Sequence, residues 1–264
     1  TGAPWADPMI ETLALAALGG AIVGLLLAAF GGGGSVLATP WLIYVVGIAD
    51  VHVAIGTSAA AVALNALAGL LGQARAGAVK WPCASVFAVA GVSGALIGAH
   101  VAKQVDGQAL LGWFAIAMAL VALSMMRAPR STGDPLVRLD AARTMKLAPI
   151  GLLVGLAAGF FGIGGGFLIA PGLMAATGMT LSNAAASSLV SVSLFGASTS
   201  ASYAMSGQID GPILAAMVAG GALGTVPGIF LARVLARKVL IARRLFAAMV
   251  LLVALLVLWN VLAA

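Results

Sequence analysis

Two stretches of the chain, GLLLAAFGGGGSVLATP (24–40) and GLAAGFFGIGGGFLIAP (155–171), resemble each other closely enough to decide the fold. Aligned without a gap, they carry the same residues at the start, centre and end: Gly24 with Gly155, Phe30 with Phe161, and Pro40 with Pro171. After a one-residue deletion the correspondence continues with Thr57 and Ser58 on Ser187 and Ser188, Gly77 on Gly207, Pro82 on Pro212, Gly94 on Gly224, and Gly98 on Gly228. A match that runs along both halves indicates an internal duplication.

The composition predicts that this duplicated chain lies in a membrane. Of its 264 residues, 62% are hydrophobic and 8% are charged, whereas soluble domains carry about 25% charged residues. So few charges cannot cover a surface in water. Several uncharged apolar stretches have about 20 residues, the length of one bilayer crossing. We therefore predict an all-α polytopic membrane protein, and exclude a soluble or secreted one.

The apolar segments form two groups of five with the same order of long and short members. They cover 12–30, 35–46, 53–73, 82–103 and 109–126, and then 147–161, 167–177, 184–206, 212–234 and 240–262. The sequence therefore predicts a first transmembrane repeat (12–126), a linker (127–146) and a second transmembrane repeat (147–262).

The basic residues orient the two repeats. They concentrate in the linker and in the gap before the last segment: Arg127, Arg130, Arg138, Arg143 and Lys146, then Arg233, Arg237, Lys238, Arg243 and Arg244. Because basic loops stay in the cytoplasm, the chain crosses an even number of times between these regions. The short pair 147–161 and 167–177 thus contributes two crossings or none. Each half crosses an odd number of times, which predicts inverted-topology repeats. Lys103 is the one basic residue that this topology places on the outer side of the membrane, and a lysine at a helix end can snorkel to either interface.

Two glycine runs, at 31–34 and 162–166, predict broken helices. Each glycine costs a helix about 1 kcal/mol, and broken backbone at membrane depth must be buried in protein or line a wet cavity. The short helix after each break points its N–H groups back at the glycines, which favours an anion. The predicted ligands are Gly32, Gly33, Gly34 and Ser35, with Gly164, Gly165 and Gly166. Close helix packing is the alternative interpretation of these runs.

Glycines at helical spacing are predicted to serve packing instead, because small residues four apart make a flat helix face. They are Gly94 and Gly98, Gly151, Gly155 and Gly159, and Gly220, Gly224 and Gly228.

Polar side chains in the third segment of each half are candidates for the same site. No segment centre carries Lys or Arg, so backbone and hydroxyl donors would have to bind an anion. The predicted ligands are Thr57, Ser58 and Asn65 in the first half, and Ser187 and Ser188 in the second, with Ser191 and Ser193 nearby. The alternative is that such hydroxyls bond their own helix or join neighbouring helices.

Catalysis and cofactors are not expected. The two histidines, His52 and His100, form no sequence-near metal cluster, and the single Cys83 excludes an internal disulfide. No motif singles out a nucleophilic serine, and no Asp or Glu lies mid-segment to relay protons. The basic residues lie in loops between apolar segments, where the preference of basic loops for the cytoplasm accounts for them. No nucleic-acid partner is therefore expected.

The chain resembles the TauE/SafE family of bacterial sulfite and organosulfonate exporters. The resemblance is carried by GGGGSVLATPWL (31–42), AIGTSAAAV (54–62), GIGGGFLIAPGL (162–173) and AAASSLVSV (184–192). It implies a multi-pass protein of the bacterial inner membrane that exports a small sulfur-containing anion. The first half has Gly32 where the second has Ile163, and Ser35 where it has Gly166, so unequal binding by the two halves stays open.

The expected function is therefore transport by alternating access around a midplane site. A cation transporter of the same fold, with unwound carbonyls as ligands, and a membrane subunit that only scaffolds a partner are the alternatives. The expected partners are a small anion and lipid, and a homo-oligomer stays open.

Overall fold

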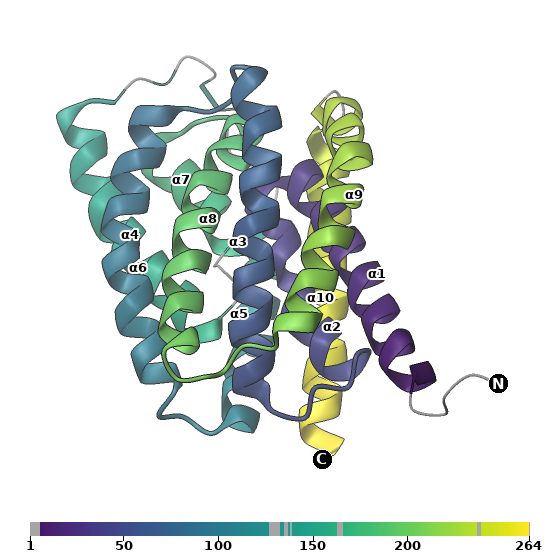
Figure 1. Ribbon diagram of the computed structural model, residues 1–264. Helices are drawn as coiled ribbons and strands as arrows, with labels where there is room; N and C mark the ends of the chain where they lie inside the picture. The colour runs from purple at the N-terminus through teal and green to yellow at the C-terminus, as the bar shows by residue number, and fades with distance from the viewer. Residues whose placement is uncertain are drawn as a thin grey trace.

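The computed structural model describes residues 6–126, 133–134, 137, 139–162, 166–236 and 239–263. In these ranges the protein is all-helical, without a strand (Figure 1). The elements are α1 (Ala6–Phe30), the 3-10 helix η1 (Gly31–Leu37), α2 (Ala38–Tyr44), α3 (Val51–Arg75), α4 (Trp81–Ala102), α5 (Gly107–Met126), α6 (Ala141–Phe161), α7 (Gly166–Thr177), α8 (Leu181–Ala204), α9 (Gly211–Ala236) and α10 (Val239–Ala263).

Short polar side chains set where several helices begin. The Asp50 carboxylate accepts hydrogen bonds from the backbone N–H groups of His52 (2.8 Å) and Val53 (3.4 Å), which have no partner within α3. Asp106, Asp140, Thr180 and Asp210 act in the same way on α5, α6, α8 and α9. Because Asp140 caps α6, that helix begins at Ala141, and the last residues of the predicted linker 127–146 are helical.

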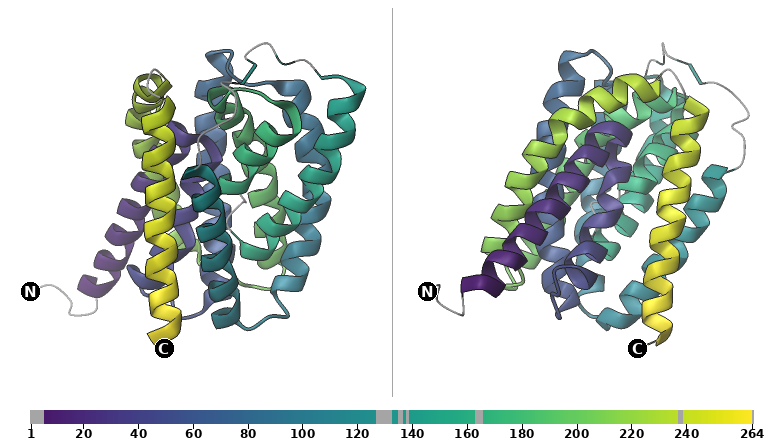
Figure 2. Two further views of the ribbon diagram at one scale, coloured as in Figure 1. Left: turned by 180° about the vertical axis from the view of Figure 1, so that it is seen from behind. Right: turned by 90° about the vertical axis from the view of Figure 1, so that its right-hand side faces the viewer.

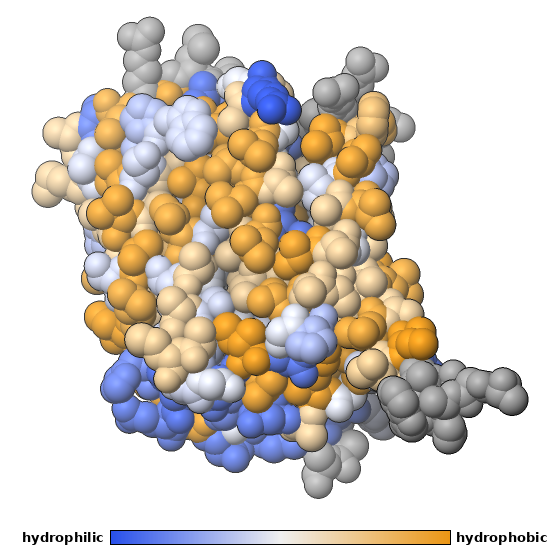
Figure 3. Space-filling model, viewed as in Figure 1, coloured by the Kyte–Doolittle hydropathy of each residue, from blue (hydrophilic) through white to orange (hydrophobic). Residues whose placement is uncertain are grey.

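The outer surface of the bundle is suited to lipid. Seven helical stretches of the described residues are long and apolar enough to cross a membrane. Large apolar side chains point outward, such as Leu223 (76% exposed) and Trp259 (75% exposed). Figure 3 shows apolar residues over most of one face and hydrophilic residues gathered at its lower end. The protein is therefore a multi-pass membrane protein, as the composition predicts.

Spaced glycines bring helices from different halves together. Helix α1 packs along α9, and α6 packs along α4. A Cβ added to Gly224 would collide with the backbone of Ala21, and one added to Gly155 with the backbone of Gly91. The other spaced glycines also face the backbone of the partner helix: Gly94, Gly98, Gly151, Gly159, Gly220 and Gly228. The packing prediction for these glycines is confirmed.

The most buried helices, α3 and α8, pack against each other at the centre, and α5 packs on α10. Corresponding helices of the two halves run in opposite directions (Figures 1 and 2): α1 and α3 rise from the lower end, whereas α6 and α8 descend from the upper end.

The upper end is also where the chain returns after α7. The backbone N–H of Asp134, in the linker, donates to the carbonyl of Gly178 (2.8 Å), and Asp134 bridges to Met179 just before α8. The pair α6 and α7 thus begins and ends at one side of the protein.

Candidate functional site

The first glycine run lies in the interior of the protein, where α1 is followed by the 3-10 helix η1. Helix α1 ends at Phe30, Gly31 adopts a left-handed φ of 68°, and the chain continues as η1. Glycine takes this conformation without the strain that a Cβ would add. All residues from Gly31 to Ser35 are buried. The second run starts in the same way, because Gly162 ends α6 with a φ of 67°.

Each glycine run packs against the central helix of the other half. Gly31 lies against the backbone of Ala185 in α8, and Gly162 lies against the side chain of Ile55 in α3. The predicted ligands Gly164 and Gly165 lie outside the described residues.

The two runs touch where Gly32 meets Gly166, and this point is called the glycine contact. A Cβ on Gly166 would collide with the Gly32 carbonyl, and a Cβ on Gly32 would lie 2.7 Å from the Gly166 Cα. Real Cβ atoms do not approach so closely, so both positions require glycine. The neighbouring Gly33 faces the ring of Phe246 and Gly34 faces the backbone of Leu27, so close packing also accounts for these two.

Serine hydroxyls from both halves surround this contact. The Ser188 hydroxyl accepts a hydrogen bond from the Gly32 N–H (2.9 Å) and donates to the Ala185 carbonyl (2.7 Å). The Ser35 hydroxyl donates to the carbonyl of Gly32 (2.9 Å). The structure thus brings Gly32, Ser35, Gly166 and Ser188 close together, and their role in binding a substrate stays a prediction.

Ser58, the counterpart of Ser188, has a similar environment in α3. Its hydroxyl donates to the Ile55 carbonyl (3.1 Å) and bonds to the Thr39 hydroxyl (2.8 Å). Since the single proton of Ser58 is used on Ile55, Thr39 is the donor between the two hydroxyls. Sequence reasoning missed Thr39, although a hydroxyl residue beside Pro40 in the short helix α2 was the available signal.

Thr57 and Ser187 lie apart from the glycine contact and bind backbone at opposite ends of the protein. The Thr57 hydroxyl accepts from the N–H of Asp210 (2.9 Å), just before α9, and the Ser187 hydroxyl accepts from the N–H of Lys80 (2.9 Å), just before α4. Both residues are fully buried. Among the described residues their hydroxyl protons have no acceptor, so these protons could bind an anion, and that role stays a prediction.

Asn65 lies farther along α3 and faces α9. Its amide donates to the Met217 carbonyl (3.4 Å), and its side chain packs on Gly221. In the other half, Phe195 packs on Gly91 at the corresponding place. The two halves therefore differ here by one polar side chain.

Ser191 has an unused hydroxyl close to Ser188 in the chain. It follows Ser188 by almost one turn of α8, is fully buried, and its hydroxyl has no partner in the described part of the protein. Buried polar groups are nearly always hydrogen-bonded, so this donor is available to a ligand. Within the described ranges no group of three or more His, Cys, Asp or Glu could hold a metal ion.

Comparisons with known proteins give the family. Residues 16–257 match the family described as "Sulfite exporter TauE/SafE". A "Probable membrane transporter protein" of Xylella fastidiosa strain Temecula1 is 42% identical over 95% of this chain and 97% of its own length. The "Probable membrane transporter protein YunE" of Bacillus subtilis is 26% identical over 84% of this chain and 89% of its own length. No solved structure matches.

The family match covers nearly the whole chain, including both glycine runs and the serines of α3 and α8. This chain therefore belongs to the TauE/SafE family of membrane transporters.

Proposed function

We propose that the protein exports a small sulfur-containing anion, such as sulfite or an organosulfonate, across the bacterial inner membrane. The observation that carries the proposal is the hydrogen bond from Gly32 to Ser188, at the point where the glycine runs of both halves touch. Polar backbone and hydroxyl groups of both halves converge there inside the bundle. Transporters commonly bind substrate at such a junction of discontinuous helices.

The type of donor favours an anion. The buried polar side chains of the described residues, apart from the phenol of Tyr203, are hydroxyls of Ser and Thr and the amide of Asn65, without a buried carboxylate. Neutral N–H and O–H donors stabilise negative charge, whereas a cation would need oxygen ligands turned inward. Ser191 would supply its unpartnered hydroxyl, and Ser188 would turn its proton from the Ala185 carbonyl to the anion. Gly32, Gly33, Gly34, Ser35, Gly164, Gly165 and Gly166 would supply backbone groups.

We infer that 12–126 and 147–262 are inverted-topology repeats with the linker 127–146 in the cytoplasm. The opposite directions of α1 and α6 support this (Figure 2). So do the two equivalent hydrogen bonds, from Asp210 to Thr57 and from Lys80 to Ser187. Repeats of this kind allow the two halves to rock and open the site alternately to each side.

Flux measurement in proteoliposomes tests the proposal. The purified protein should move labelled sulfite and methanesulfonate, and Ser188→Ala should reduce the rate about tenfold, the effect of roughly 1.4 kcal/mol. Ser198→Ala is the matched control, because that partly exposed hydroxyl bonds the Leu194 carbonyl of its own helix (2.8 Å) and no other described residue.

The alternatives give different results in the same vesicles. Cation flux without anion flux would show that the protein is a cation transporter of the same fold. Absence of any flux would favour a membrane subunit that scaffolds a partner.

A further inference from the structure

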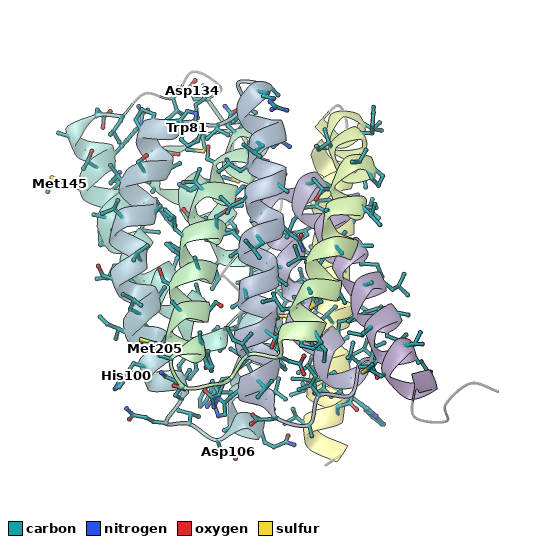
Figure 4. All side chains as sticks on the ribbon, in the orientation of Figure 1. Trp81, His100, Asp106, Asp134, Met145 and Met205 are labelled. Carbon is teal, nitrogen blue, oxygen red and sulfur yellow. The ribbon has the colours of Figure 1, made fainter. Side chains whose placement is uncertain are left out.

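We propose a second anion-binding site at the lower end of the protein, formed by Lys103, Tyr203 and His52. It is separate from the glycine contact and would hold a small oxyanion where the transport path meets water. The identity of this ligand as the transported anion rests on the proposed function. Figure 4 shows this end of the bundle, where His100, Asp106 and Met205 are labelled near the ends of α4 and α8.

The three side chains come from three different helices. Lys103 follows the last turn of α4, and its Nζ donates to the Ser202 carbonyl (3.1 Å) and the Ser206 hydroxyl (3.3 Å). The same Nζ lies 5.9 Å from the centre of the Tyr203 ring. The His52 ring, in the first turn of α3, stacks on the Tyr203 ring with 6.2 Å between centroids.

Unpartnered polar atoms mark this cluster as incomplete. Tyr203 is fully buried, and its hydroxyl has no hydrogen-bond partner among the described residues. The same holds for His52 Nδ1 and for the Oε1 of Gln208, whose backbone N–H bonds the Tyr203 carbonyl (3.0 Å). Unsatisfied buried polar atoms are rare, and three on neighbouring residues indicate that a ligand or water belongs there.

The ammonium of Lys103 favours an anion as the ligand. Three acids at this end accept backbone hydrogen bonds where helices begin: Asp50 on α3, Asp106 on α5, and Asp210 on α9. In the described part of the chain, Lys103 forms no ion pair. Its ammonium has three donors, of which two bind Ser202 and Ser206. The third donor and the Tyr203 O–H can both bind an oxyanion, with His52 as a further contact.

This site also explains the position of Lys103 in the sequence. It is the basic residue that departs from the predicted cytoplasmic distribution, and the structure turns its ammonium onto α8. An anion leaving the centre of the bundle toward this end would meet a fixed positive charge before it reaches water.

The test uses vesicles of known orientation and measures the half-saturating concentration of methanesulfonate from each side. Lys103→Gln and Tyr203→Phe should each raise it about tenfold from the side of the lower end, with little change from the other side. Lys80→Gln, which removes the same charge at the opposite end, is the matched control. Lys103→Arg should keep most of the affinity, which separates loss of charge from misfolding.

The two proposals fail in different ways. Unchanged half-saturation in both Lys103→Gln and Tyr203→Phe, with normal flux in the parent, would overturn the second site and leave the proposed function intact. If the parent carries no anion at all, labelling of Lys103 by an amine-reactive reagent decides. Slower labelling in methanesulfonate would support the site, and equal labelling would overturn it.

Discussion

Replacing Thr57 by Val and Ser187 by Ala removes two hydrogen bonds that hold equivalent places in the two halves. Each bond is 2.9 Å long and joins a buried hydroxyl to the backbone N–H that precedes α9 or α4. A hydrogen bond contributes about 0.5–1.5 kcal/mol net, and a donor left unpaired in the interior costs about 1–3 kcal/mol. Because Asp210 and Lys80 are only partly buried, water can replace part of the loss. We therefore expect each variant to lower the free energy of unfolding by about 1 kcal/mol.

The double variant should lose about 2 kcal/mol, since distant sites contribute additively. Equilibrium unfolding in mixed micelles of dodecyl sulfate, followed by tryptophan fluorescence, measures these losses. Ser198→Ala serves as the control and should change stability by less than about 0.5 kcal/mol. Unfolding of Thr57→Val and Ser187→Ala at the same detergent fraction as the parent would refute the reasoning.

The same variants decide the anion-binding role predicted for these two hydroxyls. A hydroxyl that donates to a bound anion contributes about 1–3 kcal/mol. If Thr57 and Ser187 have this role, calorimetric titration with sulfite should show weaker binding by both variants. Lower stability with unchanged affinity would assign Thr57 and Ser187 to the framework alone.

Three further predictions concern the framework around the site. Gly166→Ala should abolish flux and lower the free energy of unfolding by about 1–3 kcal/mol, because its Cβ meets the Gly32 carbonyl. Gly211→Ala is the control: no atom lies within 4 Å of the added Cβ, so this variant should unfold and transport like the parent. Gly155→Leu should separate α6 from α4, measured as a lower unfolding midpoint; an unchanged midpoint would contradict the contact with Gly91. In a Cys83→Ala background, Ser206→Cys should react with an impermeant maleimide from the periplasm and Asp134→Cys only after permeabilisation, and the reverse pattern would overturn the cytoplasmic linker.

Much of the fold could be predicted from the sequence because the signals are local. Segment length and the absence of charge identify helices that can cross a bilayer, whatever their neighbours are. Glycines such as Gly155 and Gly224 predict close helix contacts, because the spacing of residues along a helix sets which of them share a face. The alignment of Thr57 with Ser187 likewise predicts matched environments, and the equivalent bonds to Asp210 and Lys80 agree with it.

The partners of the polar groups depended on the tertiary structure. A serine in a helix can bond a carbonyl of its own helix or reach a neighbour, so only the packing of α8 on η1 decides that Ser188 meets Gly32, 156 residues away. Packing likewise separates Thr57 and Ser187 from the glycine contact, and turns Asn65 toward α9.

The cluster of Lys103, Tyr203 and His52 has no local pattern at all. It forms because the ends of α3, α4 and α8 meet at one end of the bundle. By itself the sequence determined that this chain is a helical membrane protein, and it predicted a duplication from the glycine runs at matching places. Which helices meet across the two halves, and so which polar atoms share a site, was decided by packing between residues far apart in the chain.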